Sequence, residues 1–322
     1  MNKQYNKTDI ENILRKYNLG KFKKFGKILK NDRVSFCQVI HTSKKKVFMK
    51  VFRIFGTHIK QGLIVASYME KKGFPTYETY QSKQNKSYII YKKIPIALLE
   101  YINIRARDDW PVINNSQMKS YSQGLARFHI DTKNLNLKKI PHGNFKDIKK
   151  RIKIFYKIRE KKNKKIQKIL EFMKENISNT KCPNKEYKSG YYSEYNPGHV
   201  FFSGSKIKYV IDWAIGYDNA YYDFGSSMVA CFSKNGKKLN YMKLRTYIYE
   251  YNKIRKLSSS EKEHIYEALL FGICKYGVWG LNDLKKGKIA SDKEICKDGV
   301  NRVLFIMNLS KKEFDLRLNI KS

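Results

Sequence analysis

The hydrophobic pattern of this chain changes once along its length, and that change constrains the fold more than any other feature. Two runs near the N-terminus, VSFCQVIH at 34–41 and VFMKVFR at 47–53, are rich in β-branched and aromatic residues, and the polar stretch 42–46 separates them. Such a pair of runs predicts a β-hairpin. From about residue 116 onward the apolar residues recur at helical spacing instead. A small strand-rich part followed by a larger helical part predicts an α+β fold with two lobes.

Cap and turn residues divide the two lobes further. Thr8 is expected to cap a first helix, and Gly20 is expected to end it. The remaining expected elements are a helix at 58–72, a strand at 87–92, a helix at 116–130, two helices within 145–177 that break at 159–165, a strand at 206–211, and helices after about residue 235. We place the lobe boundary after residue 94, so that the strand-rich lobe spans 1–94 and the mainly helical lobe spans 95–322.

Composition excludes several classes of protein. The 322 residues are 42% hydrophobic and 14% aromatic, with only 6 prolines, which argues against a disordered chain. No run of about 18 apolar residues is present to span a membrane, and the N-terminus lacks the apolar core of a signal peptide. The five cysteines are scattered and none forms a CxxC pair, so neither a zinc site nor a disulfide framework is indicated. We therefore expect a cytoplasmic protein with no membrane partner.

The formal net charge of +39 first suggests a nucleic-acid or other anionic partner. However, the chain has 55 lysines and only 12 arginines, whereas specific readers of phosphates and bases favour arginine. Lysine is accompanied by abundant Ile, Asn and Tyr, which share AT-rich codons with it, and the lysines of 145–177 alternate with apolar residues at helical spacing. We favour codon bias and solvated helix faces as the source of the charge over a nucleic-acid surface, which is kept as an alternative.

The stretch 191–225, YYSEYNPGHVFFSGSKIKYVIDWAIGYDNAYYDFG, carries the candidate chemistry. It contains a loop with the polar groups Glu194 and His199, and then the expected strand at 206–211, which delivers Asp212. A carboxylate directly after a buried strand is costly unless it binds something, and acids at strand ends often hold Mg²⁺ against nucleotide phosphates. The structural alternative for Asp212 is a helix cap or a turn residue.

Five segments are similar, in order and spacing, to the motifs of one enzyme family. Residues 192–202, YSEYNPGHVFF, look like a catalytic loop of the form HGDxxPxNVLF, and 210–213, VIDW, look like the IDW or IDF motif that follows it. LARFH at 125–129 and YDFG at 222–225 match further motifs, and VFMKVF at 47–52 looks like the strand with a phosphate-binding lysine. Together they resemble the aminoglycoside phosphotransferase and choline kinase family, nearest in pattern to its homoserine kinase branch. The resemblance implies a bilobal protein-kinase-like fold with a small antiparallel-sheet N-lobe and a larger helical C-lobe.

The resemblance also implies a role for each matching residue. Lys50 would pair with the phosphates of ATP, and Tyr91, on the approach to the hinge between the lobes, would contact the nucleotide. Glu194 stands where the family has its catalytic Asp, which accepts the proton of the substrate hydroxyl. His199 stands where the family has a metal-binding Asn, and Asp212 matches the second metal-binding acid that catalysis needs. ATP and Mg²⁺ are therefore the implied cofactors.

The catalytic loop departs from the family pattern. Glu194 is longer than Asp by one methylene, and a displacement near 1 Å can cost about 10²-fold in rate. His199 can ligate a metal through one nitrogen, although Mg²⁺ prefers oxygen. Tyr192 replaces the histidine of the family loop. Two other matches imply structural roles, because Asp223 is expected to tie down this loop and His129 to pack and hydrogen-bond in the core of the large lobe.

The N-terminal lobe departs from the pattern as well. Its nucleotide-covering segment, 28–35, has no glycine, so Lys30 and Arg33 would have to supply charge where the family uses backbone amides. Active kinase-like folds pair the strand lysine with a helix glutamate, but the aligned positions here carry Gln61 and Gly62.

Three functions are consistent with these patterns. The first is an ATP- and Mg²⁺-dependent phosphotransferase that acts on the hydroxyl of a small molecule. The second is a pseudokinase of the same fold that binds nucleotide or a partner with little or no turnover. The third is a basic protein that binds nucleic acid or another anionic surface, although the chain lacks an RNP motif, a zinc-finger spacing and a helix-turn-helix. A net charge of +39 does not attract polycations, and Ala214 stands where many relatives carry an acid. We therefore expect a neutral, zwitterionic or anionic substrate.

Overall fold

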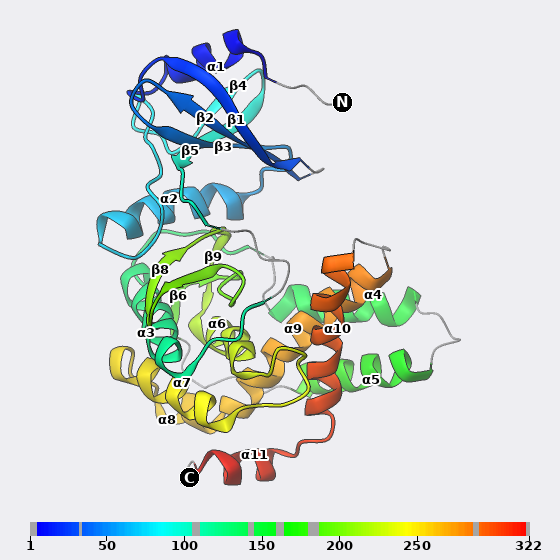
Figure 1. Ribbon diagram of the computed structural model, residues 1–322. Helices are drawn as coiled ribbons and strands as arrows, with labels where there is room; N and C mark the ends of the chain where they lie inside the picture. The colour runs from blue at the N-terminus through cyan, green and yellow to red at the C-terminus, as the bar shows by residue number, and fades with distance from the viewer. Residues whose placement is uncertain are drawn as a thin grey trace. The chain divides into compact units, whose positions relative to one another are not determined.

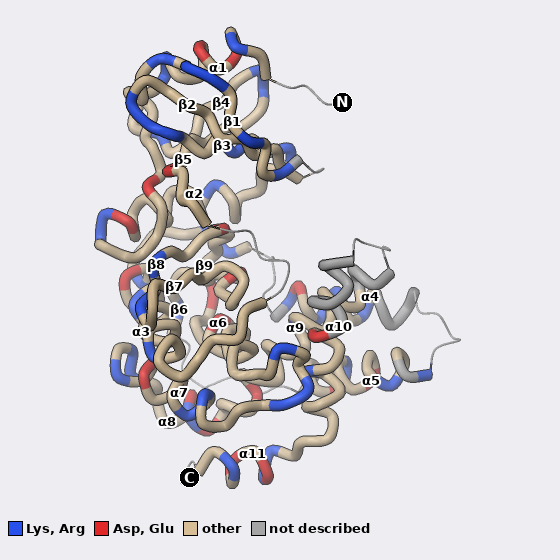
Figure 2. Tube along the Cα trace, in the orientation of Figure 1, with Lys and Arg blue, Asp and Glu red and all other residues tan. Residues whose placement is uncertain are grey.

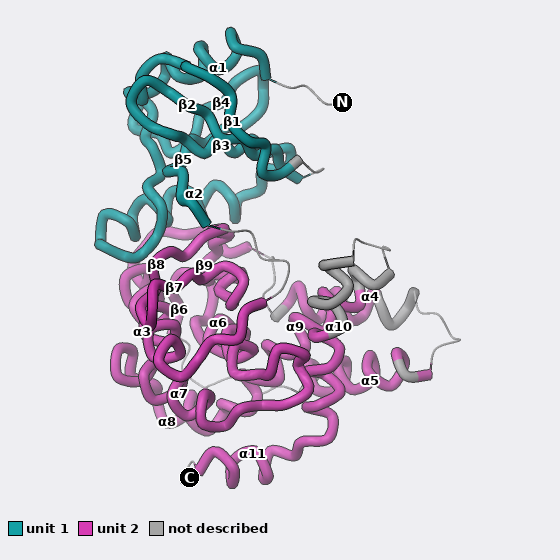
Figure 3. The backbone as a smooth tube through the Cα atoms, in the orientation of Figure 1, with its two compact units in different colours: residues 1–105 teal, residues 106–322 magenta. Residues whose placement is uncertain are grey.

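The computed structural model describes residues 5–31, 34–104, 110–140, 145–158, 164–179, 187–285 and 290–319. The chain divides into two compact units, Met1–Arg105 and Ala106–Ser322 (Figure 3). The first unit contains the sheet, and the second is mainly helical, which confirms the predicted α+β fold.

A five-stranded antiparallel sheet forms the first unit, in the order β1-β2-β3-β5-β4 (Figure 1). The expected hairpin is present as β2 and β3, in which Ser35 pairs with Phe52 and His41 with Lys46. Strands β1 and β5 were not expected from the sequence, and the predicted lobe boundary falls at the start of β5, which pairs with β3. The strands are β1 (Phe22–Asn31), β2 (Ser35–Thr42), β3 (Lys46–Phe52), β4 (Ile89–Tyr91) and β5 (Ile94–Glu100).

Helices α1 (Lys7–Leu14) and α2 (Thr57–Lys71) lie on opposite sides of this sheet (Figure 1). The cap of α1 is Asn6 and not Thr8, because the Asn6 side chain accepts the backbone N–H of Asp9 at 2.9 Å. The Asp9 carboxylate accepts the N–H of Asn6 in return, which completes a capping box. The apolar face of α1 packs on the sheet, in one cluster with residues such as Val47, Met49 and Val51 of β3.

The alternation of side chains along β3 sets the position of Lys50. Val47, Met49 and Val51 are buried on the α1 side, and successive side chains of a strand point to opposite faces. Lys50 therefore points to the other face, where α2 lies. In the sheet it is flanked by Cys37 of β2 and Ala97 of β5.

The second unit is built around helix α9 (Ile265–Lys285), which contacts α4, α5, α6, α8, α10 and α11. The predicted helix at 116–130 is present as α3, and the helices predicted within 145–177 are present as α4 and α5. The break expected at 159–165 lies mostly outside the described residues. The helices are α3 (Asn115–Thr132), α4 (Phe145–Ile158), α5 (Lys164–Asn179), α6 (Ala220–Ser227), α7 (Tyr241–Ile254), α8 (Ser259–Glu263), α10 (Ala290–Ile306) and α11 (Lys311–Leu318), with a 3₁₀ turn at Met228–Cys231.

Two short antiparallel pairs carry the loops of this unit. They pair β6 (Lys188–Tyr192) with β9 (Ile215–Asn219), and β7 (Val200–Ser203) with β8 (Lys206–Val210). Only β8 was expected from the sequence. Nearby, α6 and α9 approach so closely that a Cβ added at Gly225 would lie 2.0 Å from the carbonyl oxygen of Ala268. The glycine is therefore required by the packing of the two helices.

The positive charges do not gather on one element. Figure 2 shows Lys and Arg distributed along the described elements of both units. This distribution fits a solvated, lysine-rich surface better than one nucleic-acid interface. Within the described residues, none of the helices combines the length and the apolar character that a bilayer crossing requires.

Candidate active site

The loop between β6 and β7 is held by hydrogen bonds at both of its ends. The buried carboxylate of Asp223, on α6, accepts the backbone N–H of Tyr192, and the ring of His129 lies 3.4 Å from the same carboxylate oxygen. Within the loop, the N–H of His199 donates to the carbonyl of Asn196 at 3.0 Å. Asp223 thus ties down the loop, as expected, and His129 lies in the core, where its other ring nitrogen is 2.5 Å from the hydroxyl of Tyr251.

Three of the predicted site residues come together around this loop. Nδ1 of His199 lies 3.9 Å from the carboxylate of Glu194, and Nε2 lies 3.8 Å from the carboxylate of Asp212. Nδ1 also lies 2.9 Å from the backbone carbonyl of Glu194, which can only accept a hydrogen bond. A proton on Nδ1 satisfies this contact, which is shorter than the 3.3 Å between Nδ1 and the amide nitrogen of Asn196, and it leaves the lone pair of Nε2 facing Asp212.

The backbone at Asp212 is unusual. Its φ of +64° lies in the left-handed region, which residues other than glycine rarely adopt and which clusters at functional sites. Strand β8 is only half buried, and the Asp212 side chain is 49% exposed, so the expectation of a carboxylate after a buried strand was wrong. The energetic cost at Asp212 therefore comes from its backbone conformation and not from burial of its carboxylate. Asp212 also precedes a strand, β9, so the helix-cap alternative does not apply.

Tyr192, which stands where the related motif has histidine, connects the loop to the Asp212 segment. Its hydroxyl donates to the carbonyl of Ile211 at 2.5 Å, and its ring stacks on Trp213 with the centroids 4.8 Å apart. The tyrosine therefore holds the residues on both sides of Asp212.

Two residues of the site were missed by the sequence analysis. Asn196 is buried in the loop, and its amide lies 3.5 Å from the carboxylate of Glu194. Lys275, on α9, is only 1% exposed and donates to the carbonyl of Ser193 at 2.5 Å and to the hydroxyl of Tyr191 at 3.2 Å. A signal for Lys275 was present, because it interrupts the apolar run LLFGICKYGVWG.

Electrostatics at Glu194 reflect its partial burial. Burial raises the pKa of this carboxyl above its ordinary value, while His199 and Lys275 act in the opposite direction. Burial likewise lowers the pKa of Lys275, against the attraction of Glu194. A carboxyl whose pKa is moved toward neutrality accepts a proton more readily than an exposed one.

The predicted residues of the first unit lie on separate elements. Lys50 is on β3, as described, and Lys30 is an exposed residue of β1 opposite Cys37, while Arg33 lies outside the described residues. Tyr91 is on β4, where its hydroxyl donates to Asp9 at 2.8 Å. Because this hydroxyl is already bonded to the cap of α1, we do not carry Tyr91 into the proposed site.

No family model matches the chain, and no curated protein matches its sequence. Solved structures do match along nearly the whole chain. An amicoumacin kinase in complex with AMP-PNP and Ca²⁺ has 10% identity and a TM-score of 0.67, with 93% of each chain covered. A putative aminoglycoside phosphotransferase from Ralstonia eutropha has 12% identity and a TM-score of 0.65, with 99% of this chain and 100% of that chain covered. A choline/ethanolamine kinase family protein from Mesorhizobium loti has 11% identity and a TM-score of 0.55, with 95% of this chain and 94% of that chain covered.

This chain has the aminoglycoside phosphotransferase and choline kinase fold. The order of its motifs predicted that fold, and the structural matches confirm it. In this fold Glu194 and His199 lie in the loop between β6 and β7, and Asp212 follows β8.

A metal ion fits the pair formed by His199 and Asp212 in this phosphotransferase-like fold. Their facing atoms are 3.8 Å apart, less than twice a Mg²⁺–ligand distance of about 2.1 Å, so both can reach one ion. The hydrogen bond from Nδ1 to a backbone carbonyl is the usual second contact of a metal-binding histidine. Among the described residues, no cluster of three or more His, Cys, Asp or Glu side chains is placed to bind a metal ion. Mg²⁺ bound mainly by phosphates and water needs only one or two protein ligands.

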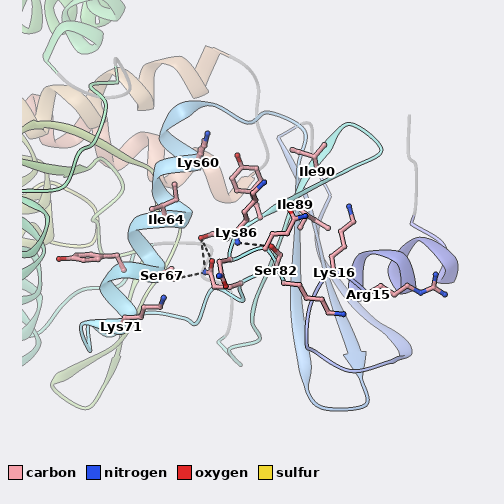
Figure 4. A pocket seen from close by; sticks show the side chains of 17 residues that line it. Arg15, Lys16, Lys60, Ile64, Ser67, Lys71, Ser82, Lys86, Ile89 and Ile90 are labelled. Atoms are coloured by element: carbon pink, nitrogen blue, oxygen red, sulfur yellow. Dashed lines mark hydrogen bonds between the residues drawn. The ribbon is translucent and has the colours of Figure 1, made fainter.

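A basic groove in the first unit is separate from these residues. It encloses about 1080 Å³ between α2, the end of α1 and the segment 81–90, and its described lining holds no Asp or Glu (Figure 4). Its polar floor is already bonded, because the Gln81 amide donates to Ser67 at 3.1 Å and to Ser87 at 3.3 Å. The basic side chains of the lining are all exposed, so water solvates their charges: Arg15, Lys16, Lys60, Lys71, Lys83 and Lys86.

Proposed function

We propose that the protein is an ATP- and Mg²⁺-dependent phosphotransferase that acts on a hydroxyl group of a small molecule. The observation that carries the proposal is that the carboxylates of Glu194 and Asp212 both lie within 3.9 Å of the His199 ring, beside a loop that Asp223 holds in place. Structures with the same fold include kinases of small molecules, among them a spectinomycin phosphotransferase in complex with ADP. Phosphoryl transfer needs positioning and charge neutralisation more than covalent chemistry. A site with one base and two ligands for a metal ion suits that requirement.

Each residue of the proposed site has one task. Glu194 orients the acceptor hydroxyl and takes its proton as the oxygen bonds to phosphorus, while the bond to the ADP oxygen breaks. His199 and Asp212 hold Mg²⁺, which neutralises charge on the phosphates when it is bound. Lys50 contributes a positive charge for the phosphates, and Lys30 and Arg33 replace the missing glycine amides with charge.

The test measures nucleotide binding and turnover separately. We expect Mg²⁺ with a non-hydrolysable ATP analogue to raise the melting temperature, and EDTA to abolish the increase. ATP turnover with a panel of small alcohols should fall by about 10³-fold in Asp212→Ala, because the metal loses its carboxylate. Glu263→Ala, which removes an exposed acid of α8, is the matched control. Absence of any Mg²⁺-dependent nucleotide binding would contradict the proposal.

A pseudokinase is the second candidate, and one observation favours it. The position where active kinase-like folds place a helix glutamate is Gln61, which is only 8% exposed on α2. An amide cannot supply the negative charge that would hold Lys50 in an ion pair. This candidate predicts Mg²⁺-dependent nucleotide binding without turnover of any alcohol. Gln61→Glu should raise turnover if the protein is a phosphotransferase and should leave it absent if the protein is a pseudokinase.

A further inference from the structure

His199 is the side chain that distinguishes this site from the motif it resembles. The related motif has an asparagine at this position, whose amide offers an oxygen to a metal, whereas the ring of His199 offers the nitrogen Nε2. Nε2 lies 3.8 Å from the carboxylate of Asp212, which is too long for a hydrogen bond. The two groups are therefore spaced as two ligands of one ion would be.

Both groups are accessible to a ligand. The side chain of His199 is 27% exposed and that of Asp212 is 49% exposed. A proton on Nδ1 satisfies the contact of 2.9 Å with the carbonyl of Glu194, so the lone pair of the ring is on Nε2. A metal ion binds such a lone pair, and it binds the carboxylate at the same time.

The backbone fixes these two ligands relative to each other. The carbonyl of His199 accepts the N–H of Ile211 at 3.0 Å, so the residue before Asp212 is bonded to His199 itself. This bond continues the pairing of β7 with β8. The carbonyl of Ile211 in turn accepts the hydroxyl of Tyr192. A site whose ligands are held in this way can discriminate between ions, because the protein does not rearrange to suit each one.

A nitrogen ligand changes which ion the site prefers. Mg²⁺ is bound mainly by oxygen and gives up its water reluctantly. Transition-metal ions accept imidazole nitrogen more readily, and among them Mn²⁺ is also suited to carboxylate and water oxygens. Zn²⁺ is usually held by three or more protein ligands, and the part of the chain that the structure describes offers no such cluster of His, Cys, Asp and Glu. One imidazole and one carboxylate, completed by phosphates and water, therefore favour Mn²⁺.

We propose that His199 makes this site selective for Mn²⁺ over Mg²⁺ as the ion that joins the protein to the nucleotide phosphates. His199 and Asp212 supply one nitrogen and one oxygen to that ion, and Mg²⁺ is accepted at the same position with lower affinity. The inference rests on the proposed phosphotransferase function and names the metal for which its site is built.

The first measurement compares two proteins that differ at one ligand. Calorimetry gives the affinity for a non-hydrolysable ATP analogue with saturating Mg²⁺ and with saturating Mn²⁺, for the unmodified protein and for His199→Asn. The preference of the nucleotide itself for Mn²⁺ cancels, because it is the same for both proteins. We expect the ratio of the Mn²⁺ affinity to the Mg²⁺ affinity to fall by at least about 10-fold in His199→Asn, since loss of even an outer contact costs a metal site about 10- to 100-fold. His264→Asn, which changes a histidine at the end of α8, is the control and should keep the ratio.

The second measurement detects the nitrogen ligand directly, by electron spin-echo envelope modulation of bound Mn²⁺. The complex contains a β,γ-methylene analogue of ATP, which has no bridging nitrogen, and protein whose histidines are labelled with ¹⁵N. A nitrogen bound to Mn²⁺ couples to its electron spin, so we expect a ¹⁵N coupling that is absent from His199→Asn and present in His264→Asn. Because the coupling is recorded first in the unmodified protein, the result does not depend on whether a variant folds.

The outcomes separate the metal site from catalysis. A ¹⁵N coupling without turnover of any alcohol would support the inference and contradict the proposed phosphotransfer. Turnover of an alcohol without a ¹⁵N coupling would overturn the inference and leave the proposed phosphotransfer intact. An affinity ratio that is the same in the unmodified protein and in His199→Asn would also overturn the inference, because the ring would then not select the ion.

Discussion

Two buried arginines of the helical unit have equal exposure and opposite surroundings. Arg255 and Arg302 are each 3% exposed. Arg255 donates to both carboxylate oxygens of Glu261, at 2.8 and 3.3 Å, and to the hydroxyl of Tyr251 at 2.6 Å. Burial acts to lower its pKa, but Tyr251 and Glu261 raise the pKa above its ordinary value. For Arg302 burial prevails, and the pKa falls.

The difference separates a cation that direct hydrogen bonds hold from one that lies mainly against aromatic rings. Arg255 finds its hydrogen bonds and its counter-charge inside the chain, so its environment is finished when the protein folds. Arg302 lies beside the rings of Trp110 and Phe232, and the charge of Asp298 on the same helix offsets its burial only in part. The lysines of the basic groove differ from both, because they are exposed and need no partner. Among these cations Arg302 is therefore the one whose burial is least compensated.

The largest effect on stability is expected at Arg255. Arg255→Met should lower the free energy of unfolding by about 3–5 kcal/mol, because it leaves the carboxylate of Glu261 buried without a counter-charge. Urea denaturation measures the change. The double variant Arg255→Met with Glu261→Leu is the control and should lose less than Arg255→Met alone, since the stranded charge is gone. Equal losses in both variants would show that the ion pair does not explain the difference between the two arginines.

A substitution of Lys275 should have an intermediate effect on stability, because the groups that accept its hydrogen bonds are neutral. Lys275→Met should lower the free energy of unfolding by about 1–3 kcal/mol, since it leaves the carbonyl of Ser193 without its donor. As Ser193 directly precedes Glu194, we also expect kcat to fall while KM for ATP changes little. Lys262→Met, at an exposed lysine of α8, is the matched control. A fall in stability without any change in kcat would assign Lys275 to packing alone.

These three cations also show what could be predicted from the sequence. The periodic segments gave the β2–β3 hairpin and helices α3, α4 and α5, because repeated apolar spacing records a buried face. Short strands such as β6 and β9 were missed, since five residues between loops carry too little pattern. The motif similarity located Glu194, His199 and Asp212. Arg255, Lys275 and Arg302 could not be distinguished from one another in advance, because burial and pairing are decided by which helices pack together.

Arg302→Met should act in the opposite direction to Arg255→Met. We expect the free energy of unfolding to rise by about 1 kcal/mol, because a buried charge that Asp298 compensates only in part is replaced by an apolar side chain of similar length. Urea denaturation of the ligand-free protein measures the change, with Arg317→Met as the exposed control. A loss of more than about 2 kcal/mol would mean that Asp298 fully compensates the Arg302 charge, and the contrast with Arg255 would disappear.

The smallest effect on stability is expected at Glu194, which is a partly buried acid where Arg302 is a buried cation. Burial raises the pKa of Glu194 above the value it has in the unfolded chain, even though His199 and Lys275 oppose the shift. Between the unfolded and the folded pKa the native state binds more protons, so this group lowers stability as the pH rises through that window. Glu194→Gln should remove this component, so that its melting temperature exceeds that of the unmodified protein at neutral pH and approaches it near pH 4. The same variant should lose phosphotransfer, because an amide cannot accept the hydroxyl proton. A melting-temperature difference that is constant across this pH range would show that the neighbouring cations fully compensate Glu194, which would remove the analogy to Arg302.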